Sequence, residues 1–234
     1  MKMFIRILLI ILLVFIGMIA YYLFSHWGNP GRSLRLSEWM HNPQSHSEWT
    51  IQASARCADA PFIFPTNGMV GYLWGDSFRP GNQHQGIDIF SGTSIGKTAV
   101  VAVYDGYLTR QSDWKSAVII RIPSDPLQTG RQIWTYYTHM ADEAGNSFIS
   151  TLFPAGTKEL FVKAGTLLGY QGDYSGDPNN PVGVHLHFSI VKDDGSGHYL
   201  NELAIKNTYD PSPYFMLALN GSENKDEVPF CRNK

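Results

Sequence analysis

The segment HQGIDIF, residues 84–90, places His84 and Asp88 four positions apart around a glycine. Imidazole nitrogens and carboxylate oxygens are both ligands for metal ions. In an extended strand the two side chains would be about 13 Å apart, too far to share a small ion. A helix is disfavoured by Gly86 and by the β-branched isoleucines that follow it. We therefore predict a bent loop that feeds a strand, with Gly86 allowing the bend and with partners supplied by other parts of the chain.

Two more candidates lie in VGVHLHFSIV, residues 182–191, where apolar residues alternate with His185, His187 and Ser189. The strand period of two predicts that the apolar set faces the core and that both histidines share the opposite face. A pair of imidazoles outside a buried face indicates binding or chemistry more than structure. The sequence therefore predicts a functional strand here.

His139 is a third candidate, because it ends the strand-like segment WTYYTHM, residues 134–140. The strand period predicts that His139 shares a face with Tyr137 and Thr135. Alone it would be an ordinary strand histidine. Its interest depends on whether the fold brings it to the other candidates.

His84, Asp88 and one histidine of the HLH pair together supply three nitrogen and oxygen ligands. This is the ligand pattern of catalytic zinc sites, in which a fourth position stays open for water. The remaining two histidines can then handle protons. Zinc is favoured over calcium or magnesium because imidazole dominates the set. The other histidines lie in linker or Gly/Ser-rich contexts and are predicted to be solvated: His26, His41, His46 and His198.

Short strands must position these residues, since the 22 glycines and 13 prolines favour turns over long helices. No amphipathic helix of ten or more residues is evident between Pro61 and Ile190. An Asp105–Gly106 turn between two strand-like runs predicts a hairpin within residues 99–110. The sequence predicts one all-β domain, with further strands in residues 116–122, 131–140, 165–172 and 183–191.

The amino terminus has the pattern of a membrane segment. Residues 7–24 are uncharged and mostly apolar, long enough to cross a bilayer as a helix, and Lys2 and Arg6 precede them. The small-residue cleavage pattern is poor, which favours a signal anchor over a cleaved signal peptide. We predict a transmembrane helix in residues 1–24, a juxtamembrane linker in 25–56, and the functional domain in 57–234. The linker has room for a short helix, and its tryptophans could pack on the domain.

The chain contains two cysteines, Cys57 and Cys231, near the two ends of the predicted domain. A bridge between them would suit an oxidising compartment, and two free buried thiols are the alternative. Both positions are too remote from the histidines to predict a zinc–thiolate site.

Two function classes are disfavoured by the sequence. A formal net charge of −2 gives no basic surface for nucleic acid. SGTSIGKT, residues 91–98, looks like a phosphate-binding loop but is one residue short of the required spacing. The segment after it reads as a strand and not as the helix that would hold phosphate. We therefore predict no nucleic-acid or nucleotide partner.

The ordered motifs HQGID, YTH and HLH resemble the lysostaphin-type (LytM-like) zinc endopeptidases of the duplicated hybrid motif superfamily, which cut peptide bonds in peptidoglycan. VAVYDGYL is similar to the hairpin of that family, VKAGTLLGYQG to its glycine-bearing approach to the paired histidines, and YDPSPYF to its usual ending. The resemblance covers about residues 61–217 and does not reach residues 1–56.

This resemblance implies an antiparallel β-sheet core with a groove closed by loops. It implies Zn²⁺ held by His84, Asp88 and His187. His185 would be the general base that activates the water, and His139 would orient that water or stabilise the tetrahedral intermediate. Residues 124–132 and 141–160 are longer than a compact version needs, so we expect them to wall the groove and alter substrate choice.

The resemblance implies a zinc metalloendopeptidase that hydrolyses stem peptides or crosslinks of peptidoglycan in cell wall remodelling. Its expected place is the bacterial cytoplasmic (inner) membrane, single-pass, with the catalytic domain in the periplasm or outside the cell. The main alternative is a catalytically inactive module that binds wall or activates another wall hydrolase. A Gly-rich protein or a peptide unrelated to the wall remains open as substrate.

Overall fold

The structure is a computed structural model that describes residues 2–26, 30–77, 81–224 and 227–231 of the 234-residue chain. Its helices are α1 (Lys2–His26), α2 (Pro30–His41) and the short α3 (Ser212–Phe215), with 3₁₀ turns η1 (Pro43–Trp49) and η2 (Ile205–Asn207). The described strands are β1 (Met69–Tyr72), β2 (Ile87–Phe90), β3 (Ala99–Val101), β4 (Gly106–Thr109), β5 (Val118–Ile122), β6 (Ile133–Thr138), β7 (Leu160–Val162), β8 (Leu167–Tyr170), β9 (His185–Lys192) and β10 (Thr208–Tyr209).

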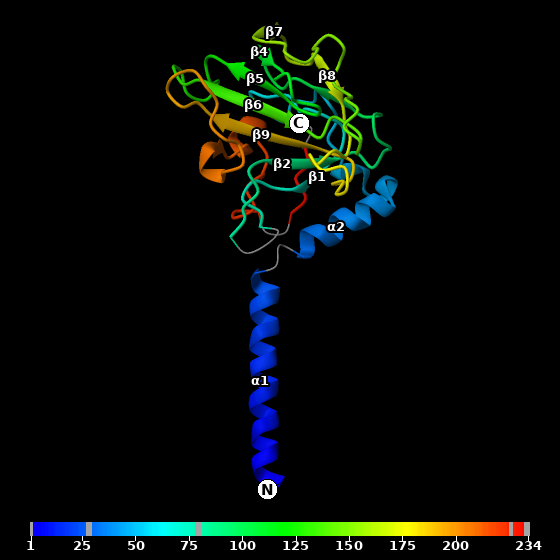
Figure 1. The fold of residues 1–234 in the computed structure, drawn as a ribbon, viewed down its shortest axis with the longest axis vertical. Coiled ribbons are helices and arrows are strands. Elements are labelled where there is room, and N and C mark those ends of the chain that lie inside the picture. Colours follow the sequence, from blue (N-terminus) through cyan, green and yellow to red (C-terminus); the bar gives the residue numbers. More distant parts are fainter. Residues whose placement is uncertain (1, 27–29, 78–80, 225–226, 232–234) are drawn as a thin grey trace.

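The strands form one large antiparallel sheet and one small one (Figure 1). The order in the large sheet is β1-β2-β9-β6-β5-β4-β7, and β10 also pairs with β9. β3 and β8 make the small sheet. The predicted antiparallel β core is therefore confirmed. The predicted 99–110 hairpin is wrong, because β3 pairs with β8 while β4 pairs with β5 and β7.

Gly106 has a different role from the turn that the sequence suggested. A Cβ at Gly106 would lie 2.5 Å from the backbone oxygen of Arg121 on β5. The glycine therefore serves the close approach of β4 to β5 and not a turn between β3 and β4.

One face of the large sheet builds the core. On β9 the side chains of Leu186, Phe188 and Ile190 join a single cluster of buried apolar residues, as the alternation predicted. The same cluster includes Val100 of β3 and Leu168 of β8. The core therefore lies between the large sheet and the segments that carry the small sheet. Because the apolar side chains of β9 face this core, the residues between them point to the opposite face of the sheet.

The opposite face of the large sheet is divided into three zones. At one side α2 packs on β1, and Leu36 and Trp39 form a cluster with Met69. At the other side Trp134 and Val191 lie in a separate apolar cluster. The histidine-bearing parts of β2, β9 and β6 lie between these two clusters. The apolar clusters leave a polar strip of sheet between them, and the candidate site occupies that strip.

Part of the segment predicted as a linker belongs to the packed domain. Trp39 is 1% exposed and Leu36 is 8% exposed. α2 lies against β1, as Figure 1 shows. The predicted possibility that a tryptophan of this segment packs on the domain is therefore confirmed for Trp39.

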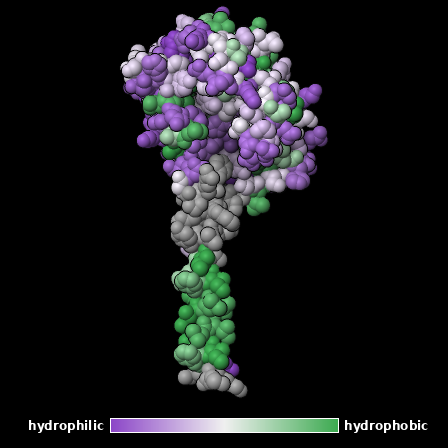
Figure 2. Space-filling view, viewed as in Figure 1, coloured by the Kyte–Doolittle hydropathy of each residue, from purple (hydrophilic) through white to green (hydrophobic). Residues whose placement is uncertain are grey.

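α1 is a 25-residue helix whose described side chains, residues 4–19 and Tyr21, are exposed. Figure 2 shows that the visible surface of these residues is hydrophobic, in contrast to the mixed surface of the domain. In the part of the chain that the structure describes, none of the helices combines the length and apolar character that a membrane span needs. The predicted helix is present, and its predicted membrane-spanning role is not supported.

The two cysteines form a disulfide, Cys57–Cys231, with their Cα atoms 5.2 Å apart. The bridge joins positions 174 residues apart in the sequence and so ties the beginning of the predicted domain to the end of the chain. The predicted bridge is confirmed, and the alternative of two free thiols is not.

Candidate metal centre

Strand register places Asp88 and His187 opposite each other. β2 and β9 are antiparallel neighbours, and Asp88 pairs with His187 across them. On the other side of β9, His187 pairs with Thr138 of β6. Directly opposed residues have their Cβ atoms about 5 Å apart, so the two side chains meet without any special loop. Sheet pairing alone therefore brings two residues together that are 99 positions apart.

His84 reaches the same point from a bent loop before β2, as predicted. Its backbone is held on both sides, because Gly75 N–H donates to His84 O at 2.8 Å and His84 N–H donates to Asp76 O at 2.7 Å. Gly86 follows without a left-handed φ. A Cβ there would lie only 2.1 Å from the backbone oxygen of Phe188 on β9. The glycine is needed for close strand approach and not for the bend that the sequence suggested.

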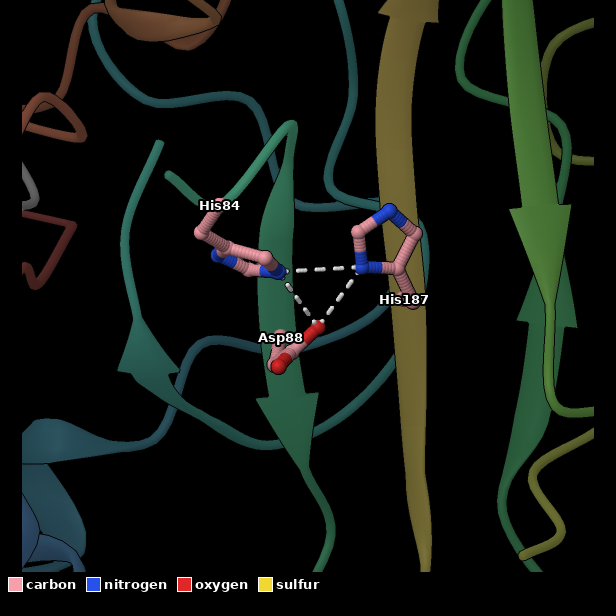
Figure 3. A group of neighbouring side chains, drawn as sticks. All are labelled: His84, Asp88 and His187. Carbon is pink, nitrogen blue, oxygen red and sulfur yellow. Dashed lines mark hydrogen bonds and ion pairs between the residues drawn. The ribbon is translucent and has the colours of Figure 1, made fainter. Parts of the chain in front are cut away.

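Three side-chain atoms converge at this point (Figure 3). His84 Nε2 is 3.1 Å from Asp88 Oδ1 and 3.1 Å from His187 Nδ1, and the last two atoms are 2.8 Å apart. All three residues are buried. Ligand atoms of a tetrahedral zinc site, with bonds of about 2.0–2.1 Å, are about 3.3 Å apart. The observed triangle is close to that spacing.

The outer nitrogen of each of these imidazoles has an oxygen partner. His84 Nδ1 lies 2.9 Å from Leu73 O, a backbone carbonyl that can only accept, so this nitrogen donates. His187 Nε2 lies 2.8 Å from the Glu202 carboxylate and donates there. In their neutral forms both rings then aim a lone pair at the carboxylate of Asp88. Three acceptors that face one another need a cation or a proton between them, which is the fit expected of a metal site.

The electrostatics of His187 agree with this reading. Burial disfavours its charged form, but hydrogen bonds with Asp88 and Glu202 and their negative charges outweigh burial and raise the pKa of His187 to about 10. Burial raises the pKa of Asp88, but the nearby imidazoles hold that pKa well below its usual range. A proton on His187 supplies positive charge next to the carboxylates of Asp88 and Glu202. The position of His187 therefore favours positive charge.

His185 lies two positions before His187 on the same strand face, as the alternation predicted. Its Nε2 is 3.7 Å from Asp88 Oδ1, and its Nδ1 donates to Gly183 O at 3.0 Å. The ring stacks on Phe90 with centroids 4.9 Å apart. Burial lowers the pKa of His185. This imidazole is therefore neutral, fixed in one orientation, and able to accept a proton.

His139 completes the group, although not in the way the strand pattern predicted. β6 ends at Thr138, and His139 has a left-handed φ of 71°. An extended residue 139 would point into the core with Tyr137, so the predicted shared face with Tyr137 and Thr135 is wrong. The backbone turn instead brings the His139 ring to 4.5 Å from the His185 ring, measured between centroids. A non-glycine residue at positive φ is costly, and such positions are enriched at functional sites.

His139 is also held in one orientation. Its Nδ1 donates to Tyr174 O at 2.7 Å. Burial, and then repulsion from positive charge on His185 and His187, lowers the pKa of His139 to about 3. This imidazole remains neutral at ordinary pH. All five residues singled out in the sequence therefore lie in one group, while His41 and His198 are exposed elsewhere.

A cavity of about 440 Å³ opens over these residues. A second cavity of about 260 Å³ adjoins it and shares Tyr136, Thr138, His139 and Ser175 with the first. The predicted wall loops, residues 124–132 and 141–160, contribute no residue to the described lining of either cavity, so that prediction is wrong. The walls come from the segments around residues 72, 113–117, 174–182 and 202–203.

Glu202 is the residue near the centre that sequence reasoning missed. It follows a Gly/Ser-rich loop, and no spacing in the sequence connects it to His187, 15 positions earlier. Burial alone would raise the pKa of Glu202, but the hydrogen bond with His187 and the charge on that ring outweigh burial and lower this pKa. The carboxyl is therefore ionised. Only the folded structure reveals it.

No protein-family model matches the chain, and no curated protein does either. Among solved structures, the antimicrobial peptidase lysostaphin from Staphylococcus simulans is 18% identical, over 70% of this chain and 55% of that chain, with a TM-score of 0.39. A putative glycyl-glycine endopeptidase, lytM, from Ruminococcus gnavus is 26% identical, over 56% of this chain and 45% of that one, with a TM-score of 0.36. A mutant catalytic domain of the prophage-encoded protein EnpA from Enterococcus faecalis is 24% identical, over 64% and 95%, with a TM-score of 0.35.

The chain spans about half the length of the first two structures. Both lysostaphin and a lytM protein, the types that the sequence motifs resemble, are thus among the structures similar to this chain.

Proposed function

We propose that this protein is a zinc-dependent endopeptidase that hydrolyses peptide bonds in peptidoglycan. The observation that carries the proposal is the convergence of His84, Asp88 and His187 on one point, with two further neutral imidazoles beside it. Three nitrogen and oxygen ligands with a fourth position open to a cavity form the pattern of catalytic zinc sites.

His84 Nε2, Asp88 Oδ1 and His187 Nδ1 would hold the ion. Zinc supplies a Lewis acid that polarises a scissile carbonyl and lowers the pKa of water to about 7. The ligand set fits zinc. Two imidazoles, each with its outer nitrogen donating a hydrogen bond, would offer neutral nitrogens, and Asp88 would offer one negatively charged oxygen.

His185 would act as the general base. Its Nδ1 donates to Gly183 O, which leaves the Nε2 lone pair facing the cavity and 3.7 Å from Asp88 Oδ1. A neutral imidazole with a lowered pKa accepts a proton from water and returns it to the leaving amine. The proton of the attacking water would therefore pass to His185, which lies beside the three metal ligands and is not one of them.

His139 would orient the attacking water or stabilise charge in the tetrahedral intermediate. Its Nδ1 is fixed by Tyr174 O, so its Nε2 faces the cavity from the turn that follows β6, whereas His185 lies on β9. Approach from a second direction suits a group that aligns the water relative to the carbonyl.

The wall substrate in this proposal comes from the resemblance of the three sequence motifs to lysostaphin-type peptidases. The two adjoining cavities support an extended substrate, since together they continue past the centre in the direction of residues 113–117. We place the domain outside the cytoplasm, in the bacterial envelope. The Cys57–Cys231 disulfide supports this location.

The test is to incubate the purified protein, loaded with zinc, with peptidoglycan sacculi and to identify released fragments by mass spectrometry. We expect muropeptide fragments with new amino termini. Peptides unrelated to the wall are incubated in parallel, and faster cleavage of those would assign a different substrate. Binding to sacculi with no release by zinc-loaded protein would favour the inactive wall-binding module.

A further inference from the structure

Arg32 lies on α2, outside the part of the chain that resembles a known family, yet it is only 4% exposed. Its Nε is 3.0 Å from Asp76 Oδ2, and Asp76 is 7% exposed. Its guanidinium also donates to Asn224 O at 2.5 Å. α2 thus places a buried guanidinium against a buried carboxylate in the β1–β2 loop.

Asp76 shapes the turn on which this pair acts. Its Oδ2 accepts the backbone N–H of Leu73 at 2.7 Å, and its own N–H donates to Leu73 O at 3.1 Å. A carboxylate this buried requires a cation to remain charged at low cost. Arg32 supplies that cation, so the turn from Leu73 to Asp76 depends on α2 for its charge balance.

The same turn holds His84 at three points. Leu73 O accepts the His84 Nδ1 hydrogen, Asp76 O accepts the His84 backbone hydrogen, and Gly75 N–H donates to His84 O. The side-chain contact decides which nitrogen of His84 faces Asp88 (Figure 3). These three contacts with His84 all come from the four-residue turn Leu73–Asp76.

We propose that Arg32 is a positioning residue for the metal centre: it acts through Asp76 and the Leu73–Asp76 turn to fix His84 with Nε2 directed at the metal position. α2 is then a structural part of the site and not merely a spacer before the domain. The inference rests on the proposed function, because it concerns the same zinc site.

The experiment compares the full chain with Arg32→Met, Asp76→Asn and the double variant. Arg35→Met, on the same helix and half-buried, is the matched control. Zinc affinity is measured by competition with a chromophoric chelator. Loss of an outer residue that orients a ligand typically weakens metal binding about 10–100-fold, and we expect this range for Arg32→Met and no change for Arg35→Met. The double variant should bind no more weakly than the weaker single variant, because both act through one contact.

A second readout does not need metal. In the zinc-free protein the Nδ1 hydrogen of His84, held by Leu73 O, should give a slowly exchanging downfield NMR signal that Arg32→Met loses and Arg35→Met keeps. If the wild-type chain binds no zinc, the proposed function fails and this signal alone decides the positioning role. Should Arg32→Met not fold, Arg32→Lys replaces it, and we expect weaker zinc binding than in the wild type.

Unchanged zinc affinity together with an unchanged His84 signal in a folded Arg32 variant would overturn the inference. A double variant whose loss of zinc affinity equals the sum of the two single losses would also overturn the inference. Such additivity would show that Arg32 does not act through Asp76.

Discussion

Two sides of one pocket contain the same side chain in opposite electrostatic settings. On one side His187 lies between the carboxylates of Asp88 and Glu202, and its pKa is raised to about 10. On the other side His139 donates to a backbone carbonyl, and burial lowers its pKa to about 3. Hydrogen-bond partners, and not residue type, therefore divide these buried imidazoles into a group that favours positive charge and a group that stays neutral.

Removing a member of the carboxylate side should have the largest effect. In His187→Ala the three-atom group loses one nitrogen and leaves Asp88 and Glu202 without their shared partner. We expect the purified variant to retain almost no zinc and to release no wall fragments. Metal content is measured by elemental analysis, with the exposed His198→Ala as the control. Normal zinc content in His187→Ala would transfer the ligand role to His185.

Removing a member of the neutral side should slow hydrolysis strongly and leave zinc binding unchanged. His185→Ala and His139→Ala leave the converging atoms in place, so zinc content should match the wild type. Loss of a proton-transfer group commonly costs about 10²–10⁴-fold in rate. Fragment release should therefore fall by at least about a hundredfold while the melting temperature changes little. If both variants cut sacculi at the wild-type rate, the division of roles is wrong.

A smaller effect is expected from the outer carboxylate. Glu202→Ala removes the acceptor of His187 Nε2, and Glu202→Gln keeps an acceptor without the charge. We expect about 10–100-fold weaker zinc binding for Glu202→Ala and a smaller loss for Glu202→Gln. Chelator competition measures both, and equal losses would show that charge and not orientation is what Glu202 provides.

The smallest effects concern the stability of the zinc-free protein as a function of pH. The raised pKa of His187 contributes stability that is present below about 6.5 and lost as the pH rises through about 10. The lowered pKa of His139 contributes the reverse: its share is present above about 6.5 and lost as the pH falls toward 3. Each contribution is a few kcal/mol at most. Stability should therefore be greatest near pH 6.5.

Denaturant unfolding at several pH values, in the presence of a chelator, measures this profile. His187→Gln should flatten the alkaline limb and His139→Gln part of the acidic limb, since buried carboxylates and His185 also contribute on the acidic side. A wild-type profile that is flat from pH 6.5 to 10 would contradict the raised pKa of His187.

The sequence was sufficient where strand period decides the outcome. The alternation in β9 placed both histidines on one face, and the loop-then-strand reading of residues 84–90 was correct, because apolar positions fix the register of a half-buried strand. The cysteine positions also led to the observed disulfide.

The sequence was insufficient where one backbone angle or a distant contact decides. The left-handed φ of His139 moves its side chain from the core face of the sheet to the face that carries His185, and no pattern in WTYYTHM signals this angle. Glu202 contacts His187 from a loop after β9, and Arg32 contacts Asp76 from α2, and no sequence pattern signals either contact. The two long loops, residues 124–132 and 141–160, were expected to wall the groove because of their length, but they line neither cavity, because loop length does not specify direction.

The most direct test of the central claim is a crystal structure of the zinc-loaded protein with anomalous data at the zinc edge. The account predicts one ion at about 2.0–2.1 Å from His84 Nε2, Asp88 Oδ1 and His187 Nδ1, with His185 Nε2 and His139 Nε2 facing the open position and not bonded to the metal. An ion bonded to His185 or His139 in place of His187, or no ion among these residues at saturating zinc, would contradict it.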